Sequence, residues 1–298
     1  MVTLAGGTGG AKLARGLLDV SDALTVIANS GDDVEVYGVH VAPDPDLVTY
    51  WLADAIDGRG YGLKGDSWQV MDALAGAGVP TWFRLGDRDL AMCLVRTQRL
   101  RDGARMTEAH AAVVEALGVP ARVLPMCDES VQTWVRHRGR TMPFQEYMIV
   151  ERAAAPVERV ELRGIEQARP STEALAALDE ADLIVIGPSN PVISIGPILG
   201  LSGMRAALSQ APAPVIAVSP FVGGRSLKGP TEHFCAWAGI EPSAGGVARA
   251  YADVIDAMVA DEEIEGLPCL VTDTLLDTPR RRLRLAREIS SFAKSLSR

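Results

Sequence analysis

The sequence predicts a three-layer α/β/α fold, in which a mostly parallel sheet lies between helices, together with a helical insertion. Short apolar runs of about the length of a buried strand alternate with amphipathic stretches, and turn-forming residues follow each run. Strands that alternate with helices are typical of a parallel sheet covered on both faces. The sequence shows no internal repeat and no low-complexity linker, so we expect one compact unit.

Five apolar runs are the first predicted strands, at residues 1–5, 24–28, 122–125, 183–187 and 214–218. Residues 11–20 form the first predicted helix, because their leucines recur at helical spacing. Ser171 begins another helix, since serine is a favoured N-cap residue. Residues 141–164 alternate enough to predict a strand or a hairpin at an edge. The chain ends with a strand-like run at 269–272 and a basic amphipathic helix at 279–296.

Residues 46–118 differ from the rest of the chain. Their pattern is largely helical, and segments containing glycine at 58–65 and 76–80 break it. We interpret 46–118 as a mainly helical cap over the ends of the strands. Residues 1–45 and 119–298 would then form the core that binds the ligand.

The composition excludes several classes of protein. The 298 residues carry a formal net charge of −9, and a negative surface repels phosphate backbones, so no nucleic-acid partner is expected. The four cysteines and four histidines are scattered, so any metal is expected to be a hard ion bound by oxygen. Because the N-terminus has no basic segment and no apolar run reaches the length of a membrane span, we expect a cytoplasmic protein without a membrane partner.

A glycine-rich segment separates the first predicted strand from the first predicted helix. It comprises Gly6, Gly7, Thr8, Gly9, Gly10, Ala11 and Lys12. Glycines let the backbone turn tightly and approach a ligand, and a helix N-terminus presents N–H groups and the positive end of the dipole. These features predict a cradle for phosphate, to which Lys12 adds a charge. A merely tight turn is the alternative, and the position directly after a strand argues against it.

Four aspartates follow the second predicted strand. Asn29, Asp32 and Asp33 lie where that strand ends, which is where ligands bind in open α/β sheets, and Asp44 and Asp46 follow on a proline-stiffened loop. Paired carboxylates on loops bind Mg²⁺ together with substrate phosphates, whereas helix capping is the plainer interpretation. Four such acids beside a phosphate cradle favour a metal site or a general base.

Two further segments carry polar residues suited to ligand binding. The Gly-Asp-Arg-Asp run at 86–89 is either an internally paired cap or a grip on a polar ligand. Ser189 and Asn190 lie between prolines after the strand at 183–187. A second ligand-binding loop belongs there in a doubly wound sheet, although either residue can also cap a helix.

These segments, in this order, resemble the 2-phospho-L-lactate transferase family of deazaflavin coenzyme F-420 biosynthesis. The matching pieces run from residue 3 to about 230 and read AGGTGGAKL, NSGDD, PDPD, LGDRDLA, LVRTQRLRDG, LPMCDE, PFQEY and IGPSNPVISIGPIL. The resemblance implies a Rossmann-like fold, dependence on Mg²⁺ and a homodimer. It implies transfer of a phospholactyl or phosphoenolpyruvyl unit from a guanosine diphosphate ester to the hydroxyl of the deazaflavin FO, with release of GMP.

The resemblance also assigns roles to the candidate residues. The diphosphoguanosine would be bound by Gly6, Gly7, Thr8, Gly9, Gly10, Lys12, Asn29, Ser189 and Asn190. FO would be bound by Asp44, Asp46, Gly86, Asp87, Arg88 and Asp89. Asp32 with Asp44, or with Asp46 in its place, would hold Mg²⁺. Asp46 or Asp87 would orient or deprotonate the attacking hydroxyl.

Two other classes of protein compete with this interpretation. A sister family of nucleotide-sugar-binding regulators also opens with a glycine-rich segment and an acidic second-strand loop, and it would bind a UDP-sugar without turnover. The runs at 86–89 and 187–191 favour the transferase. A nicotinamide-dependent dehydrogenase is disfavoured because Lys12 stands at the third glycine position of the dinucleotide fingerprint.

Overall fold

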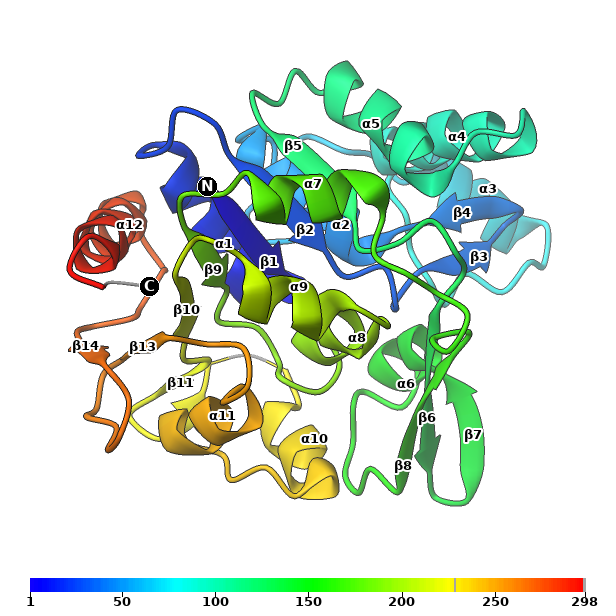
Figure 1. The fold of residues 1–298 in the computed structure, drawn as a ribbon. Helices are drawn as coiled ribbons and strands as arrows, with labels where there is room; N and C mark the ends of the chain where they lie inside the picture. The colour runs from blue at the N-terminus through cyan, green and yellow to red at the C-terminus, as the bar shows by residue number, and fades with distance from the viewer. Residues whose placement is uncertain (228, 297–298) are drawn as a thin grey trace.

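The computed structural model describes residues 1–227 and 229–296, and within them the main sheet has seven strands that all run parallel. In spatial order the strands are β14 (Cys269–Val271), β13 (Ala257–Ala260), β10 (Val215–Val218), β9 (Ile184–Ile186), β1 (Val2–Ala5), β2 (Thr25–Ala28) and β5 (Arg122–Pro125). The predicted α/β fold is confirmed (Figure 1). The short run that forms β13 was not predicted as a strand.

Helices cover both faces of the sheet, which is why its strands are largely apolar. In β9, Ile184 and Ile186 face one core cluster and Val185 faces the other, as the two-residue period of a strand requires. The first cluster packs against α7 (Thr172–Asp179), α8 (Ile195–Gly200), α9 (Met204–Gln210), α10 (Thr231–Ala238) and α11 (Ala244–Ala250). The second packs against α1 (Gly7–Leu18), α2 (Pro43–Leu52), α5 (Met106–Ala116) and α12 (Pro279–Ala293).

The order of the strands reverses between β1 and β9. The chain runs from β1 outward to β2 and β5, and then returns to place β9 on the other side of β1. Leu4 pairs with Ile186, and the N–H of Gly187 donates to the carbonyl of Leu4 at 2.9 Å, so the two strands end side by side. The segments that follow them therefore diverge from one point, which is where ligands bind in open α/β sheets.

Three of the predicted polar segments are the first turns of helices. The glycine segment begins α1 at Gly7 rather than at residue 11, Pro43 begins α2, and Asp87 begins α4 (Asp87–Arg101). The prediction of a proline-stiffened loop at Asp44 and Asp46 is wrong, and the first helix begins earlier than predicted. Proline is well suited to the first helical position, and aspartates in a first turn stabilise the helix dipole, so the same residues that suggest a polar loop also start a helix.

The segment between residues 132 and 163 folds apart from the main sheet. It forms an antiparallel sheet of β6 (Gln132–His137), β7 (Arg140–Pro143) and β8 (Arg159–Arg163), with α6 (Phe144–Ile149) between the last two strands (Figure 1). A strand or hairpin at an edge was predicted only for residues 141–164, so β6 and α6 were not predicted, and β7 and β8 pair with β6 rather than with an edge of the main sheet. Arg138 and Gly139 have φ of 49° and 73°, the backbone of a tight two-residue turn, so the chain pairs with itself locally.

Residues 46–118 contain most of α2 and the helices α3 (Gln69–Gly76), α4 and α5. The hairpin of β3 (Val34–Val36) and β4 (Val39–Val41) packs with α3 and α4 in a small core of its own. The predicted boundary at residue 46 falls inside α2, whose Val48 and Leu52 pack beneath the main sheet. The division into core and cap stays a prediction. No helix in the described ranges is both long and apolar enough to cross a bilayer.

Ser171 is the N-cap of α7, as predicted. It is buried, and its Oγ accepts a hydrogen bond from the N–H of Ala174 at 3.2 Å. We expect Ser171→Ala to lower the free energy of unfolding by about 1 kcal/mol, because this N–H loses its partner. Urea unfolding followed by circular dichroism measures the change. The control Ser209→Ala, on the exposed side of α9, should stay within about 0.5 kcal/mol, and an equal loss in both variants would contradict the capping role.

Candidate functional site

A cavity of about 1300 Å³ opens where β1 and β9 end. Most of the predicted site residues line it: Gly6, Gly7, Thr8, Gly9, Lys12, Asp32, Asp44, Asp46, Gly86, Asp89, Ser189 and Asn190. Four others are not among its lining residues: Gly10, Asn29, Asp87 and Arg88. A large cavity with a few convergent polar groups is typical of a small-molecule site.

The glycines of α1 allow its first turn to touch the segment after β9. A Cβ at Gly9 would lie 2.1 Å from the carbonyl oxygen of Pro188, and one at Gly10 would lie 2.7 Å from Oγ of Ser189. Gly10 therefore serves close packing behind the cavity. The first N–H groups of a helix have no partner within it, so Thr8 and Gly9 present donors at the cavity wall.

Asp44 connects α2 to the start of α1. Its Oδ1 accepts from the N–H of Gly7 at 2.6 Å, and its Oδ2 accepts from Nδ2 of Asn29 at 2.9 Å. Asn29 is fully buried behind the cavity, so it positions Asp44. Burial raises the pKa of Asp44 to about 6, although these two hydrogen bonds lower it. A carboxylate thus occupies part of the predicted anion cradle.

Asp32 supplies a second buried carboxylate at this wall. Its Oδ1 is buried and has no hydrogen-bond partner among the described residues. Burial, reinforced by the charge of Asp44, raises the pKa of Asp32 well above its usual value. An orphaned carboxylate oxygen beside a second carboxylate fits a hard cation such as Mg²⁺. The predicted metal residues Asp32 and Asp44 therefore suit the ion chemically.

Asp46 is held by an arginine that the sequence interpretation did not single out. Arg96 is fully buried and donates from Nη1 to Oδ1 of Asp46 at 2.6 Å and from Nη2 to Oδ2 at 2.8 Å. Arg96 also donates to the carbonyl of His40 at 2.9 Å. The spacing of Asp89, Cys93 and Arg96 could have shown that Arg96 faces the site, since residues three and four apart share one face of a helix.

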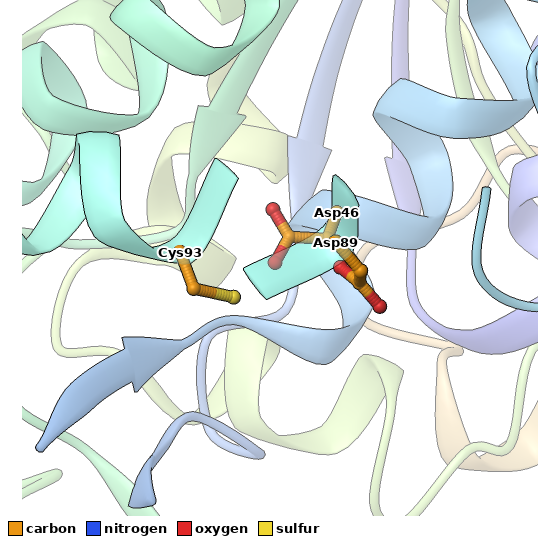
Figure 2. Close-up of side chains that lie close together, drawn as sticks. All are labelled: Asp46, Asp89 and Cys93. Carbon is orange, nitrogen blue, oxygen red and sulfur yellow. The ribbon is translucent and has the colours of Figure 1, made fainter. Parts of the chain in front are cut away.

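Asp89 lies one turn before Cys93 on α4 and close to Asp46 (Figure 2). Its Oδ1 accepts from the hydroxyl of Tyr50 at 2.5 Å. Burial, followed by the negative charge of Asp46, raises the pKa of Asp89 to about 7. Ligand atoms of Asp46, Asp89 and Cys93 all lie within 4.8 Å of one another. Thiolate is a poor ligand for Mg²⁺ and Arg96 already neutralises Asp46, so this trio does not suit that ion.

The first turn of α4 mainly organises the neighbouring chain. Asp87 accepts from the N–H groups of Gln69 and Val70 at 3.1 and 3.0 Å, so it caps α3. The N–H of Arg88 donates to Oδ1 of Asp66 at 2.7 Å, and its guanidinium reaches the carbonyl of Lys64. The predicted catalytic role of Asp87 and the predicted ligand contact of Arg88 gain no support from these positions.

The segment after β9 adds hydrogen-bonding groups to the cavity. Oγ of Ser189 accepts from the N–H of Gly6 at 3.3 Å, which ties this segment to the glycine segment. Oδ1 of Asn190 accepts from the N–H of Val192 at 2.8 Å, while its Nδ2 has no partner in the described part of the chain. Because Asn190 lines the cavity, this amide is a donor suited to a ligand oxygen.

Aromatic rings and guanidinium groups from residues 59–84 form another part of the wall. The Arg59 guanidinium lies over the rings of Tyr61 and Trp68, at 4.9 and 5.1 Å from their centroids. The Arg84 guanidinium lies 5.0 Å from the Trp68 centroid. These residues line the cavity, and the sequence interpretation predicted only that some cap would cover it. Such a wall suits a flat aromatic ligand.

This chain is a Rossmann-like α/β protein with a parallel sheet. Its candidate ligand site is the cavity where the strand order reverses, between β1 and β9. The chain belongs to the 2-phospho-L-lactate transferase family, because the family model described as 2-phospho-L-lactate transferase CofD matches residues 1–268. The predicted family membership is confirmed.

Curated relatives agree with this assignment over nearly the whole chain. A phosphoenolpyruvate transferase of Kitasatospora aureofaciens is 38% identical, with 99% of this chain and 98% of that protein covered. A 2-phospho-L-lactate transferase of Methanosarcina mazei is 36% identical, with 96% and 98% covered. A solved structure of a UPF0052-family protein from Bacillus halodurans matches with a TM-score of 0.62 at 17% identity over 97% of this chain and 98% of that one, which shows a shared fold.

Proposed function

We propose that this transferase moves a phospholactyl or phosphoenolpyruvyl unit from a guanosine diphosphate ester to the hydroxyl of the deazaflavin FO and releases GMP. The names of the relatives support the transferred unit. The observation that carries the proposal is that one cavity combines a phosphate-type cradle with an aromatic wall. The predicted cytoplasmic location and homodimer remain part of the proposal.

The cradle side suits the diphosphate of the donor. Thr8 and Gly9 offer N–H groups at the start of α1, and Asn190 offers its amide. Two carboxylates, Asp32 and Asp44, stand at the same wall and would repel a diphosphate by themselves. Mg²⁺ held by these two carboxylates would supply charge neutralisation for the phosphates.

The aromatic wall of the cavity suits FO, the acceptor of the transferred unit. The guanidinium groups of Arg59 and Arg84 lie over the rings of Tyr61 and Trp68, and a flat deazaflavin can extend this stack of planar groups. Transfer of a phosphoryl-type group needs the hydroxyl and the diphosphate in line and needs neutralisation of charge more than covalent catalysis. A cavity that holds both substrates meets the first need.

The direct test is to incubate the protein with FO, Mg²⁺ and each candidate ester of lactate, enolpyruvate or glycerate, and to measure GMP by chromatography. We expect GMP with at least one ester and none without FO. If no ester gives GMP, and a UDP-sugar raises the melting temperature instead, the chain is a nucleotide-sugar-binding protein and the proposal is wrong.

Asp32→Ala tests the metal site. We expect loss of Mg²⁺-dependent GMP release by about 100-fold or more with the fold retained, because Oδ1 of Asp32 has no hydrogen-bond partner and burial disfavours the charged form of this carboxylate. In the wild type, Mg²⁺ with GDP should raise the melting temperature, and this rise should vanish in the variant. The exposed Asp22→Ala serves as the control and should behave as the wild type. Turnover near the wild-type rate in Asp32→Ala would remove Asp32 from the metal site.

A further inference from the structure

The hydroxyl that attacks the donor must lose a proton, and several aspartates near the cavity are candidates to accept it. Asp46, the first predicted base, has both carboxylate oxygens bonded to the buried Arg96. Both oxygens of a carboxylate that is paired in this way are engaged by the guanidinium, so neither is left to accept the hydroxyl proton. Asp46 therefore suits a fixed charge better than a proton acceptor.

Three other aspartates, Asp32, Asp44 and Asp87, already have other roles. Asp87 caps α3 and does not line the cavity. Asp44 accepts from the N–H of Gly7 at the start of α1 and Asp32 lies near Asp44, and the proposed function uses both for the cation. None of these three leaves a carboxylate oxygen toward the acceptor side of the cavity without another role.

Asp89 differs from all of them. It lines the cavity, and its Oδ1 accepts from the hydroxyl of Tyr50 at 2.5 Å. Its Oδ2 has no hydrogen-bond partner among residues 1–227 and 229–296. One oxygen is thus fixed in place while the other can accept a proton from a bound molecule, which is the geometry a general base requires.

We propose that Asp89 accepts the proton of the attacking hydroxyl and that Tyr50 is its positioning residue. This inference rests on the proposed function. In the step, the hydroxyl oxygen forms a bond to the phosphorus that carries the lactyl or enolpyruvyl ester, and the bond from that phosphorus to the bridging oxygen breaks. The electron pair of that bond leaves with GMP, and the hydroxyl proton moves to Oδ2 of Asp89.

The surroundings of Asp89 support this role. The charged and titratable groups that face it come from α2, from the segment before α3 and from α4 itself: Asp46, Tyr50, Asp66, Cys93 and Arg96. Burial and the negative charges of Asp46 and Asp66 raise the pKa of Asp89 to about 7, while Tyr50 and Arg96 lower it. A base with a pKa near the working pH is both deprotonated and able to take a proton.

The first experiment compares Asp89→Asn with the wild type. We expect kcat to fall by about 100-fold or more, with the dissociation constant for GDP and Mg²⁺ within about twofold. The wild-type kcat should fall about tenfold per pH unit below pH 7, and this acid limb should be absent from the residual activity of the variant. Asp102→Asn, at the exposed far end of α4, is the matched control and should keep both kcat and the acid limb.

Loss of the fold does not account for the expected result. A carboxyl whose pKa is raised by folding destabilises the folded state when it ionises, so its contribution to stability falls as the pH rises from about 4 through 7. Asp89→Asn should therefore melt no lower than the wild type at pH 8. A variant that is inactive and unfolded at pH 8 would contradict this account of Asp89.

Tyr50→Phe tests whether Tyr50 positions Asp89, because a purely structural role of Tyr50 would not change the pH dependence of kcat. It removes a hydrogen bond that lowers the pKa of Asp89, so the acid limb should shift to higher pH by about 0.5 unit or more. Wild-type kcat and an unchanged acid limb in Asp89→Asn would overturn the inference while leaving the proposed function standing. Absence of GMP from the wild type with every ester would overturn both.

Discussion

Replacing Arg96 with methionine is expected to lower the free energy of unfolding by about 3–5 kcal/mol, because it leaves the Asp46 carboxylate buried and unpaired. Arg96 has no exposed surface, Asp46 is 4% exposed, and they share two short hydrogen bonds. The substitution also removes the donor to the carbonyl of His40, which links α4 to β4. Guanidinium chloride unfolding of the purified variant measures the loss.

Two controls separate the buried pair from the helix that carries it. Arg99→Met, one turn further along α4 and exposed, should change the free energy of unfolding by no more than about 0.5 kcal/mol. The double variant Asp46→Asn with Arg96→Met should recover part of the loss, because no unpaired charge remains. A loss below about 1 kcal/mol in Arg96→Met would mean that water or another group satisfies Asp46.

The second large effect is expected at Gly9, where alanine should lower the free energy of unfolding by about 3 kcal/mol and weaken the binding of GDP. A Cβ at this position would lie 2.1 Å from the carbonyl oxygen of Pro188. That oxygen belongs to the backbone, so no side-chain rotation relieves the contact, and either α1 or the segment after β9 must move. The bond from the N–H of Gly6 to Oγ of Ser189 spans the same junction and would be strained or lost.

Gly76→Ala is the matched control for the loss of a glycine. Gly76 ends α3, and a Cβ there would meet nothing within 4 Å. Alanine is the better helix former, so this variant should be neutral or up to about 1 kcal/mol more stable. Calorimetric titration with GDP and Mg²⁺ should show weaker binding only for Gly9→Ala. Equal binding by both variants would mean that the junction does not shape the donor site.

The carboxylates of the site are themselves a source of instability. Asp32, Asp44 and Asp89 all have raised pKa values, because burial disfavours their charged forms. A chain selected only for stability would carry neutral residues at these positions, and their presence is typical of a functional site. The proposed roles of these three aspartates are to bind a cation, for Asp32 and Asp44, and to accept a proton, for Asp89.

Much of the fold follows from local patterns. The apolar runs of β1, β2, β5, β9 and β10 are buried by helices on both faces of the sheet, as expected for parallel strands that alternate with helices. β13 escaped prediction because two of its four residues are alanine and aspartates stand on both sides of it. In the segment 141–164, predicted as a strand or hairpin at an edge, β7 and β8 instead pair with β6, because whether a strand joins a sheet edge depends on partners outside the strand itself.

The sequence by itself determined the class of fold, the family and the glycines and aspartates of the cavity wall, because such residues at strand ends depend on the local backbone. Only the tertiary structure decided what each aspartate does. The chain places Arg96 against Asp46 from 50 residues away and Tyr50 against Asp89 from 39 residues away. Partners so distant in the sequence cannot be predicted from the local pattern. The partner determines whether a carboxylate is a paired charge, a cap, a metal ligand or a base.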